Sequence, residues 1–267
     1  MQGRLLPKYQ GRYQAFPKGM WQEEFRIAKD LNLDLIEFIL DFNDVEENPL
    51  LKKGGVQEIK TLIKNTSVGV QSICADYFME APLHSDNVDI VKSSQKILLR
   101  LLDSAKSLGV SDIIIPCVDQ SSLIDQNKIN RFIRNLTPML SLIEEYCINL
   151  CIETDLKPQS FVDLLDRFQS NRITVNYDIG NSAALGYCIE EELAAYGNRI
   201  TDIHIKDRIF NGSSVFLGQG NADFEKFFKI IHDYNYKGPY IIQAYRDDEG
   251  VSIFQDQLDW LKKNFYD

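Results

Sequence analysis

Short apolar runs rich in Ile and Val alternate with amphipathic stretches along the whole chain. The apolar runs lack a strict alternation of apolar and polar residues, which is typical of strands buried on both faces. These runs predict strands over residues 33–39, 68–74, 112–116, 149–152, 173–177, 200–205 and 240–242. The stretches that follow them repeat apolar residues every three or four positions, which predicts seven helices, among them those over residues 88–108, 129–146, 161–168, 191–196, 224–234 and 253–265.

The opening of the chain completes this pattern. Residues 1–5 and a helix near residues 21–31 supply one more strand and helix, which makes eight alternating pairs. Eight pairs predict an α/β fold of the (β/α)8 TIM barrel type, in a single domain over residues 1–267. An open doubly wound sheet is the competing fold, but no G-x-G-x-x-G segment follows the first strand.

Charge and hydropathy restrict the partners of the chain. The formal net charge is -10 and there is no basic run, so nucleic acid is not expected to bind. No apolar run reaches the roughly 18 to 20 residues of a membrane span, and the first residues lack a signal-peptide core. We therefore expect a cytoplasmic protein without a membrane partner. Scattered cysteines, odd in number, predict reduced core thiols at Cys74, Cys117, Cys147, Cys151 and Cys188.

Polar side chains follow most of the predicted strands at their carboxyl ends. The residues at these strand ends are Glu37, Asp76, Pro116, Glu153, Asp178, His204 and Gln243, of which all but Pro116 are polar. The carboxyl ends of barrel strands meet at one rim, where several buried carboxylates are costly unless a cation neutralises them. Two carboxylates, an imidazole and an amide oxygen suit one divalent ion, Mn²⁺, Mg²⁺, Co²⁺ or Zn²⁺. The sequence thus predicts a metal site formed by Glu153, Asp178, His204 and Gln243.

Three segments carry a family resemblance. Residues 177–181, 202–207 and 218–224 resemble those of the xylose isomerase-like barrel superfamily, and in particular its sugar and sugar-phosphate isomerase/epimerase branch. Residues 1–5 and 14–17 also resemble that branch, so the similarity extends over nearly the whole chain. The resemblance implies one divalent metal held by Glu153, Asp178, His204 and residue 243, and bound to adjacent oxygens of a sugar or sugar phosphate.

The same resemblance implies a mechanism. In the similar epimerases, two ligand glutamates move protons on opposite faces of a metal-stabilised cis-enediolate, and Glu153 matches the first of them. Gln243 stands in place of the second, and its amide cannot accept and return a proton. We therefore expect an isomerase or epimerase with Glu153 as base and Lys206 or a water as auxiliary acid. A dehydratase of keto-sugars or keto-cyclitols and a non-catalytic sugar-binding barrel remain alternatives.

Other residues are candidates for substrate contact. We expect such contacts from Arg4, Glu37, His84, Asn181 and Asp207. The turn at residues 218–220 is a further candidate substrate loop. The abasic-site endonucleases of the same superfamily use many histidines to hold several metals, and the three histidines of this chain are too few. A homodimer through helices near the rim is also an open expectation.

Overall fold

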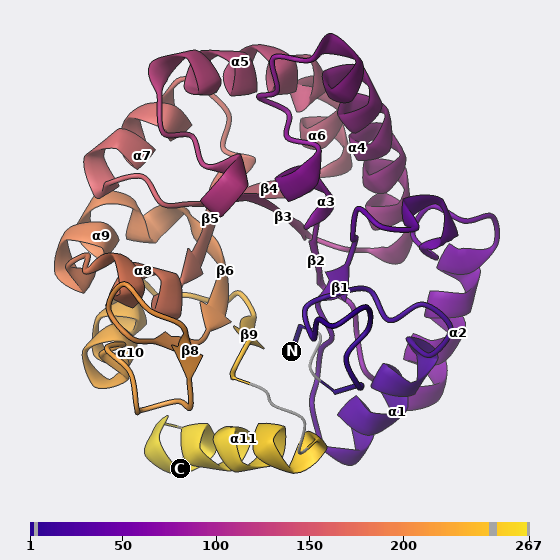
Figure 1. The fold of residues 1–267 in the computed structure, drawn as a ribbon, viewed down its shortest axis with the longest axis vertical. Coiled ribbons are helices and arrows are strands. Elements are labelled where there is room, and N and C mark those ends of the chain that lie inside the picture. Colours follow the sequence, from indigo (N-terminus) through magenta and orange to yellow (C-terminus); the bar gives the residue numbers. More distant parts are fainter. Residues whose placement is uncertain (3–4, 246–249, 266–267) are drawn as a thin grey trace.

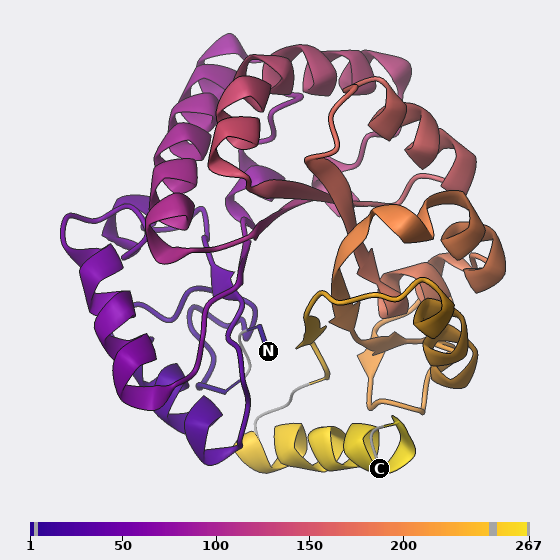
Figure 2. The same cartoon turned by 180° about the vertical axis from the view of Figure 1, so that it is seen from behind.

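A curled parallel sheet surrounded by helices forms the molecule in the computed structural model, which describes residues 1–2, 5–245 and 250–265. Figure 1 and Figure 2 show the strands as an inner ring and the helices as an outer ring. The strands pair side by side in the order β1-β2-β3-β4-β5-β6-β9. Their bounds are β1 (Phe38–Ile39), β2 (Ser72–Cys74), β3 (Asp112–Cys117), β4 (Asn149–Thr154), β5 (Ile173–Asp178), β6 (Ile200–Ile205) and β9 (Tyr240–Ile242).

The beginning of the chain closes this sheet into a barrel. Gln2 forms a parallel bridge with Glu37, and its backbone nitrogen donates to the carbonyl of Ile242 at 3.2 Å. The first residues therefore lie between β1 and β9, as Figure 1 also shows. The predicted TIM barrel is confirmed. Within the described residues, the expected strand at residues 1–5 is reduced to the bridge at Gln2.

Helices cover the outside of the barrel and connect consecutive strands. Their bounds are α1 (Gln22–Asp30), α2 (Gly55–Thr66), α3 (Tyr77–Glu80), α4 (Val88–Leu108), α5 (Gln126–Leu136), α6 (Leu140–Tyr146), α7 (Pro158–Asp166), α8 (Ile179–Leu185), α9 (Ile189–Tyr196), α10 (Phe224–Asp233) and α11 (Val251–Phe265). A small antiparallel hairpin of β7 (Asp207–Arg208) and β8 (Ser214–Val215) follows β6.

Two expectations about the elements need correction. The single helix predicted over residues 129–146 is wrong, because a 3-10 turn at Thr137–Met139 separates α5 from α6. Pro138 lies in that turn, and a proline has no backbone N–H for a continuous α-helix. The paired part of the strand expected at residues 33–39 is also short, since β1 contains only Phe38–Ile39.

The cysteines and the hydropathy agree with the sequence analysis. All five cysteines are free thiols, which confirms the prediction of reduced cysteines, although Cys147 and Cys188 are exposed rather than in the core. Among the described residues, no helix combines the length and the apolar character that crossing a membrane requires.

Aromatic packing joins helix α10 to strand β5. Phe227 of α10 is fully buried and stacks on Tyr177 of β5, with ring centroids 5.4 Å apart and planes inclined by 8°. The Asp223 side chain accepts from the backbone nitrogen of Lys226 at 3.0 Å and thereby caps the start of α10. The stack therefore positions the strand whose last residue is Asp178.

Phe227→Ala is expected to lower the free energy of unfolding by about 3 to 5 kcal/mol, because it leaves a cavity between α10 and β5. Urea unfolding measures the change. Phe210→Ala is the matched control, since Phe210 is 55% exposed, and it should cost less than about 1 kcal/mol. Equal losses for the two variants would contradict this account of the packing.

Candidate active site

A cavity of about 560 Å³ opens at the carboxyl ends of the barrel strands. Five of the expected strand-end and substrate residues line it, namely Asp76, Pro116, Glu153, Asn181 and Gln243. Lys206 and Arg208 line it as well, from the segment that follows β6. The cavity lies where active sites of TIM barrels lie.

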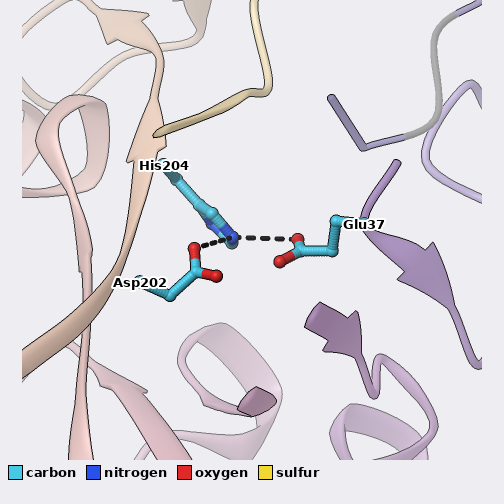
Figure 3. A group of neighbouring side chains, drawn as sticks. All are labelled: Glu37, Asp202 and His204. Atoms are coloured by element: carbon cyan, nitrogen blue, oxygen red, sulfur yellow. Dashed lines mark hydrogen bonds and ion pairs between the residues drawn. The ribbon is translucent and has the colours of Figure 1, made fainter. Parts of the chain in front are cut away.

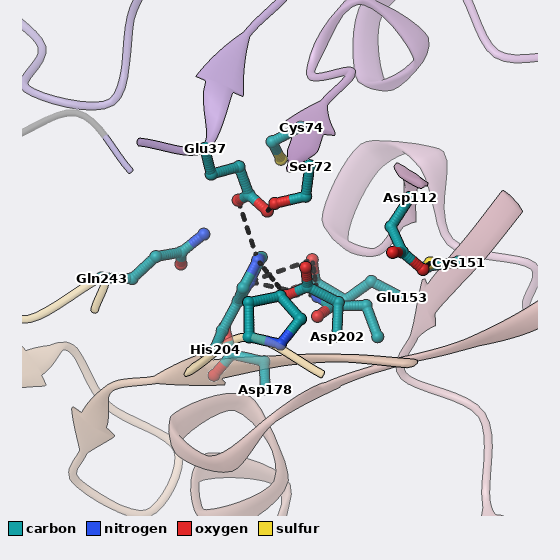
Figure 4. A network of polar contacts seen from close by, with 12 residues as sticks. Glu37, Ser72, Cys74, Asp112, Cys151, Glu153, Asp178, Asp202, His204 and Gln243 are labelled. Carbon is teal, nitrogen blue, oxygen red and sulfur yellow. Dashed lines mark hydrogen bonds and ion pairs between the residues drawn. The ribbon is translucent and has the colours of Figure 1, made fainter. Parts of the chain in front are cut away.

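Three of the predicted metal ligands converge beside this cavity. Glu153, Asp178 and His204 come from the ends of the neighbouring strands β4, β5 and β6. One ligand atom from each lies within 4.8 Å of the others, and Nδ1 of His204 is 3.9 Å from Glu153 Oε2 and from Asp178 Oδ2. Figure 4 shows the three side chains pointing into the barrel. Their chemistry and spacing fit one divalent ion.

Lys206 connects the fourth predicted ligand to this group. Its Nζ donates to Asp178 Oδ2 at 2.8 Å and to Gln243 Oε1 at 3.4 Å. Burial acts to raise the pKa of Asp178, but the Lys206 ammonium and His204 outweigh burial and hold that pKa below its ordinary value. Asp178 is therefore a carboxylate at neutral pH, and the ammonium lies beside two of the predicted ligands.

Glu153 differs from Asp178 in its electrostatics. Burial, and then the nearby charge of Asp178, raise the pKa of Glu153 to about 7. The side-chain amide of Asn181 donates to Oε1 at 2.6 Å, and that of Asn176 lies 3.3 Å from Oε2. These amides fix the orientation of the carboxyl group. A carboxyl group that is half ionised near neutral pH can both accept and release a proton.

His204 is held from the opposite side by a second, deeper cluster. Its Nε2 lies 3.0 Å from Glu37 Oε1 (Figure 3). Ser72 Oγ donates to Glu37 Oε2 at 2.7 Å. Burial lowers the pKa of His204, but the carboxylates of Glu37, Glu153 and Asp202 together outweigh burial and raise that pKa to about 9. Glu37 holds a proton on Nε2, so Nδ1, which faces Glu153 and Asp178, is the nitrogen that could bind a metal once it has lost its own proton.

Asp202 completes the deeper cluster. It precedes His204 by two residues on β6, so both side chains point into the barrel, and its Oδ1 lies 3.9 Å from Nε2. Burial, followed by the charge of Glu37, raises the pKa of Asp202 well above its ordinary value. Asp202 and Glu37 are 0% and 1% exposed and do not line the cavity, whereas Glu153 does. Of the two groups around His204, only that of Glu153 opens toward a substrate.

Asp207 organises a loop instead of lining the cavity. Its carboxylate is fully buried and accepts from the backbone nitrogens of Gly218 at 2.9 Å, Gly220 at 2.8 Å and Ala222 at 3.1 Å. A Cβ at Gly220 would collide with the same carboxylate. The glycine turn is therefore shaped by its contact with Asp207, and neither glycine lines the cavity.

The remaining predicted contacts lie elsewhere. His84 is 3% exposed, and its Nε2 lies 2.7 Å from the carbonyl oxygen of Ser121, away from the cavity lining. Glu37 is buried next to Ser72 and does not line the cavity. The prediction for Arg4 concerns a residue outside the described part of the chain.

Several residues of the site were missed by the sequence analysis. Asn176 and Asp202 were missed although each precedes a predicted ligand by two residues, which is the period of side chains on one strand face. That period could have identified both. Arg12, which lines the cavity and pairs with Asp41 at 2.8 Å, has no comparable signal in the sequence.

Comparison with known proteins agrees with this geometry. The sequence profile of the xylose isomerase-like TIM barrel family matches residues 25–264, so the chain belongs to that family. The resemblance inferred from the motifs is thereby confirmed. A probable L-ribulose-5-phosphate 3-epimerase, UlaE of Mycoplasma pneumoniae, is 24% identical over 260 residues, which cover 94% of this chain and 85% of that protein.

Solved structures share the fold at low sequence identity. The 3-keto-D-glucoside 4-epimerase YcjR from E. coli superposes with a TM-score of 0.74 at 16% identity and covers 98% of both chains. The IOLI protein, solved with a zinc atom, superposes with a TM-score of 0.70 at 16% identity over 92% of this chain and 94% of that one. At these identities the two structures support the barrel fold alone.

Asp76→Asn is expected to change how stability depends on pH. Burial raises the pKa of Asp76 from its ordinary value of 3.8 to about 6, so the folded protein holds this proton more tightly than the unfolded chain does. The wild type should therefore lose stability relative to the variant as pH rises from about 4 to 6. At pH 8 the variant should be more stable by up to about 3 kcal/mol, and at pH 3.5 the two should be nearly equal.

Urea unfolding of both proteins across this pH range measures the difference. Asp125→Asn serves as the control, because Asp125 is a cap whose pKa is lowered by the backbone nitrogen of Lys128. That variant should be less stable than the wild type at pH 8. A pH-independent difference for Asp76→Asn would contradict the raised pKa.

Proposed function

We propose that this chain is a divalent-metal-dependent sugar or sugar-phosphate isomerase or epimerase in which Glu153 is the base. The observation that carries the proposal is the convergence of Glu153, Asp178 and Nδ1 of His204 beside the cavity. The family membership and the epimerase relative support an enzyme of the isomerase class. A cavity of about 560 Å³ is also of the size that small-molecule sites have.

Glu153, Asp178 and His204 would hold the metal, with the amide oxygen of Gln243 as a fourth ligand. Oxygen and nitrogen ligands of this kind suit Mn²⁺, Mg²⁺, Co²⁺ or Zn²⁺. A bound divalent ion supplies Lewis acidity toward a carbonyl oxygen of the substrate. The Lys206 ammonium is paired with Asp178, which would also bind the metal. We therefore expect the ammonium to move away from Asp178 when the metal binds.

Glu153 moves the proton in this proposal. Its carboxylate takes a proton from the carbon next to the carbonyl group, and the electron pair of the C–H bond forms the double bond of an enediolate. The electrons of the C=O π bond move to its oxygen. Return of the proton to the former carbonyl carbon, with a proton gained by its oxygen and one lost from the neighbouring hydroxyl, converts a ketose into an aldose or the reverse. Lys206 Nζ, which donates to Asp178 and Gln243, is the proposed acid for a substrate oxygen.

Gln243 decides between the candidate reactions. Inversion of a carbon requires a proton to leave one face and arrive at the other, and an amide cannot supply the second proton. Isomerisation on one face, or epimerisation completed by Lys206 or a water, needs Glu153 as the only carboxylate base. Dehydration of a keto-sugar is a second candidate, because it too needs one base. Loss of water from the substrate would distinguish dehydration from isomerisation and epimerisation.

Glu153→Gln is expected to abolish exchange of substrate hydrogen with D2O, because an amide cannot accept the proton. With Mn²⁺ and L-ribulose 5-phosphate, proton NMR should show a loss of at least about 100-fold in the exchange rate. Glu58→Gln is the control, since Glu58 is exposed on α2 and accepts from Gln22 at the surface. Exchange at an unchanged rate in Glu153→Gln would rule out this base.

Gln243→Glu is expected to strengthen Mn²⁺ binding at least about tenfold, because it adds a charged oxygen ligand. Calorimetric titration of the two proteins measures the affinity, and NMR of the product measures inversion at C3, which the variant should gain. Gln120→Glu adds the same charge to the cavity wall and should change the affinity less than about threefold. Equal affinities in all three proteins would place residue 243 outside the metal site.

A further inference from the structure

Three cationic side chains line the cavity among the described residues, namely Arg12, Lys206 and Arg208. Two of them are neutralised within the protein. Arg12 pairs with Asp41 at 2.8 Å, and Lys206 pairs with Asp178 at 2.8 Å. Arg208 is different, because no carboxylate of the described residues lies within ion-pair distance of its guanidinium group. It is thus the one cavity cation in the described chain that lacks an anionic partner.

Neutral oxygen atoms hold Arg208 in place. Its Nε and Nη2 donate to the carbonyl of Gly212 at 3.1 and 2.8 Å, and its Nη1 donates to Oδ1 of Asn181 at 2.8 Å. A guanidinium group has five N–H donors, so these contacts leave one on each terminal nitrogen. The side chain is therefore oriented but not neutralised.

The position of Arg208 is fixed by its hairpin. Arg208 of β7 pairs with Ser214 of β8, and the hairpin lies against α8, which carries Asn181 (Figure 1). A structural role in the hairpin between β7 and β8 explains why Arg208 bonds to Gly212. It does not account for an uncompensated charge in a cavity wall, in a chain whose net charge is -10. A partly buried cation without a partner costs free energy, which a bound anion would recover.

We propose, on the basis of the proposed function, that Arg208 binds the terminal phosphate of a ketose phosphate. Ser213 and Ser214 line the cavity with Arg208 and offer hydroxyl donors to the remaining phosphate oxygens. A fork of two N–H groups together with two hydroxyls suits a phosphate, which has three terminal oxygens, better than a carboxylate, which has two. The same residues therefore distinguish a sugar phosphate from a free sugar.

Arg208 is also linked to the base. Asn181 accepts from Arg208 through Oδ1 and donates to Glu153 Oε1 through Nδ2 at 2.6 Å. One amide side chain thus separates the phosphate-binding group from the group that moves the proton. A phosphate held by Arg208 would fix how far along the sugar the reacting carbon lies. Arg208 would in this way select the carbon from which Glu153 takes the proton.

The test compares L-ribulose 5-phosphate with L-ribulose, both with Mn²⁺, in the wild type and in Arg208→Gln. The wild type should prefer the phosphorylated sugar by roughly 10- to 100-fold in kcat/KM. Arg208→Gln should lose most of that preference, because its KM should rise much more for the phosphorylated sugar than for L-ribulose. Arg208→Lys, which keeps the charge and loses the fork, should fall between them.

Arg12→Gln is the matched control, because it removes a cavity arginine that already has an anionic partner. It should reduce the preference less than Arg208→Gln does. Three outcomes would overturn the proposal. The first is a wild type whose kcat/KM is equal for the two sugars. The second is an Arg208→Gln variant whose kcat/KM falls equally for both sugars, as a disturbance of Asn181 and Glu153 would cause. The third is a larger loss of the phosphate preference in Arg12→Gln than in Arg208→Gln.

Binding of inorganic phosphate separates this proposal from the proposed function. In thermal unfolding without any sugar, phosphate should raise the melting temperature of the wild type and not that of Arg208→Gln, and acetate at equal ionic strength should have a smaller effect. An equal effect of acetate would overturn the assignment to phosphate. If neither sugar exchanges hydrogen with D2O while phosphate binding still depends on Arg208, then the proposed reaction fails and the phosphate site remains.

Discussion

The burial of four carboxyl groups around one imidazole is the constraint on which the rest of the site depends. His204 is fully buried, with Glu37 and Asp202 near Nε2 and with Glu153 and Asp178 near Nδ1. Buried carboxylates are costly unless protons or cations compensate them. The structure compensates each in its own way. Asp178 pairs with Lys206 and Glu37 with His204, while Asp202 and Glu153 have raised pKa values.

The two nitrogens of the His204 ring therefore have different surroundings and different roles. Glu37 holds the proton on Nε2, and the pair it forms with His204 is sealed inside the barrel. Nδ1 is then the nitrogen that faces Glu153 and the cavity. A carboxylate that fixes the tautomer of a ligand histidine in this manner also increases the basicity of the other nitrogen. The deeper cluster therefore prepares the ligand set without touching a substrate.

The features of the site that follow from local sequence patterns could be predicted. Strand periodicity located the strand ends, and the ends of neighbouring parallel strands meet, so Glu153, Asp178 and His204 could be placed together. The contact of Glu37 with His204 could not be predicted, because it joins residues 167 positions apart. It also depends on whether the side chain of Glu37, just before the two-residue strand β1, points into the barrel. The bonds from Asp207 to the glycine turn depend likewise on how a loop folds back.

The amide at Gln243 changes what the remaining residues have to do. With a glutamine there, the ammonium of Lys206 has Asp178 as its only charged partner among these ligands, and Glu153 is the only group of the ligand set with a pKa near neutrality. A site with two opposed bases can act on either face of a carbon. A site with one base depends on how the substrate is held, because the carbon nearest to Glu153 is the one that reacts. In our proposal, Arg208, which one amide side chain separates from Glu153, positions the substrate and so supplies selectivity that a second glutamate would otherwise share.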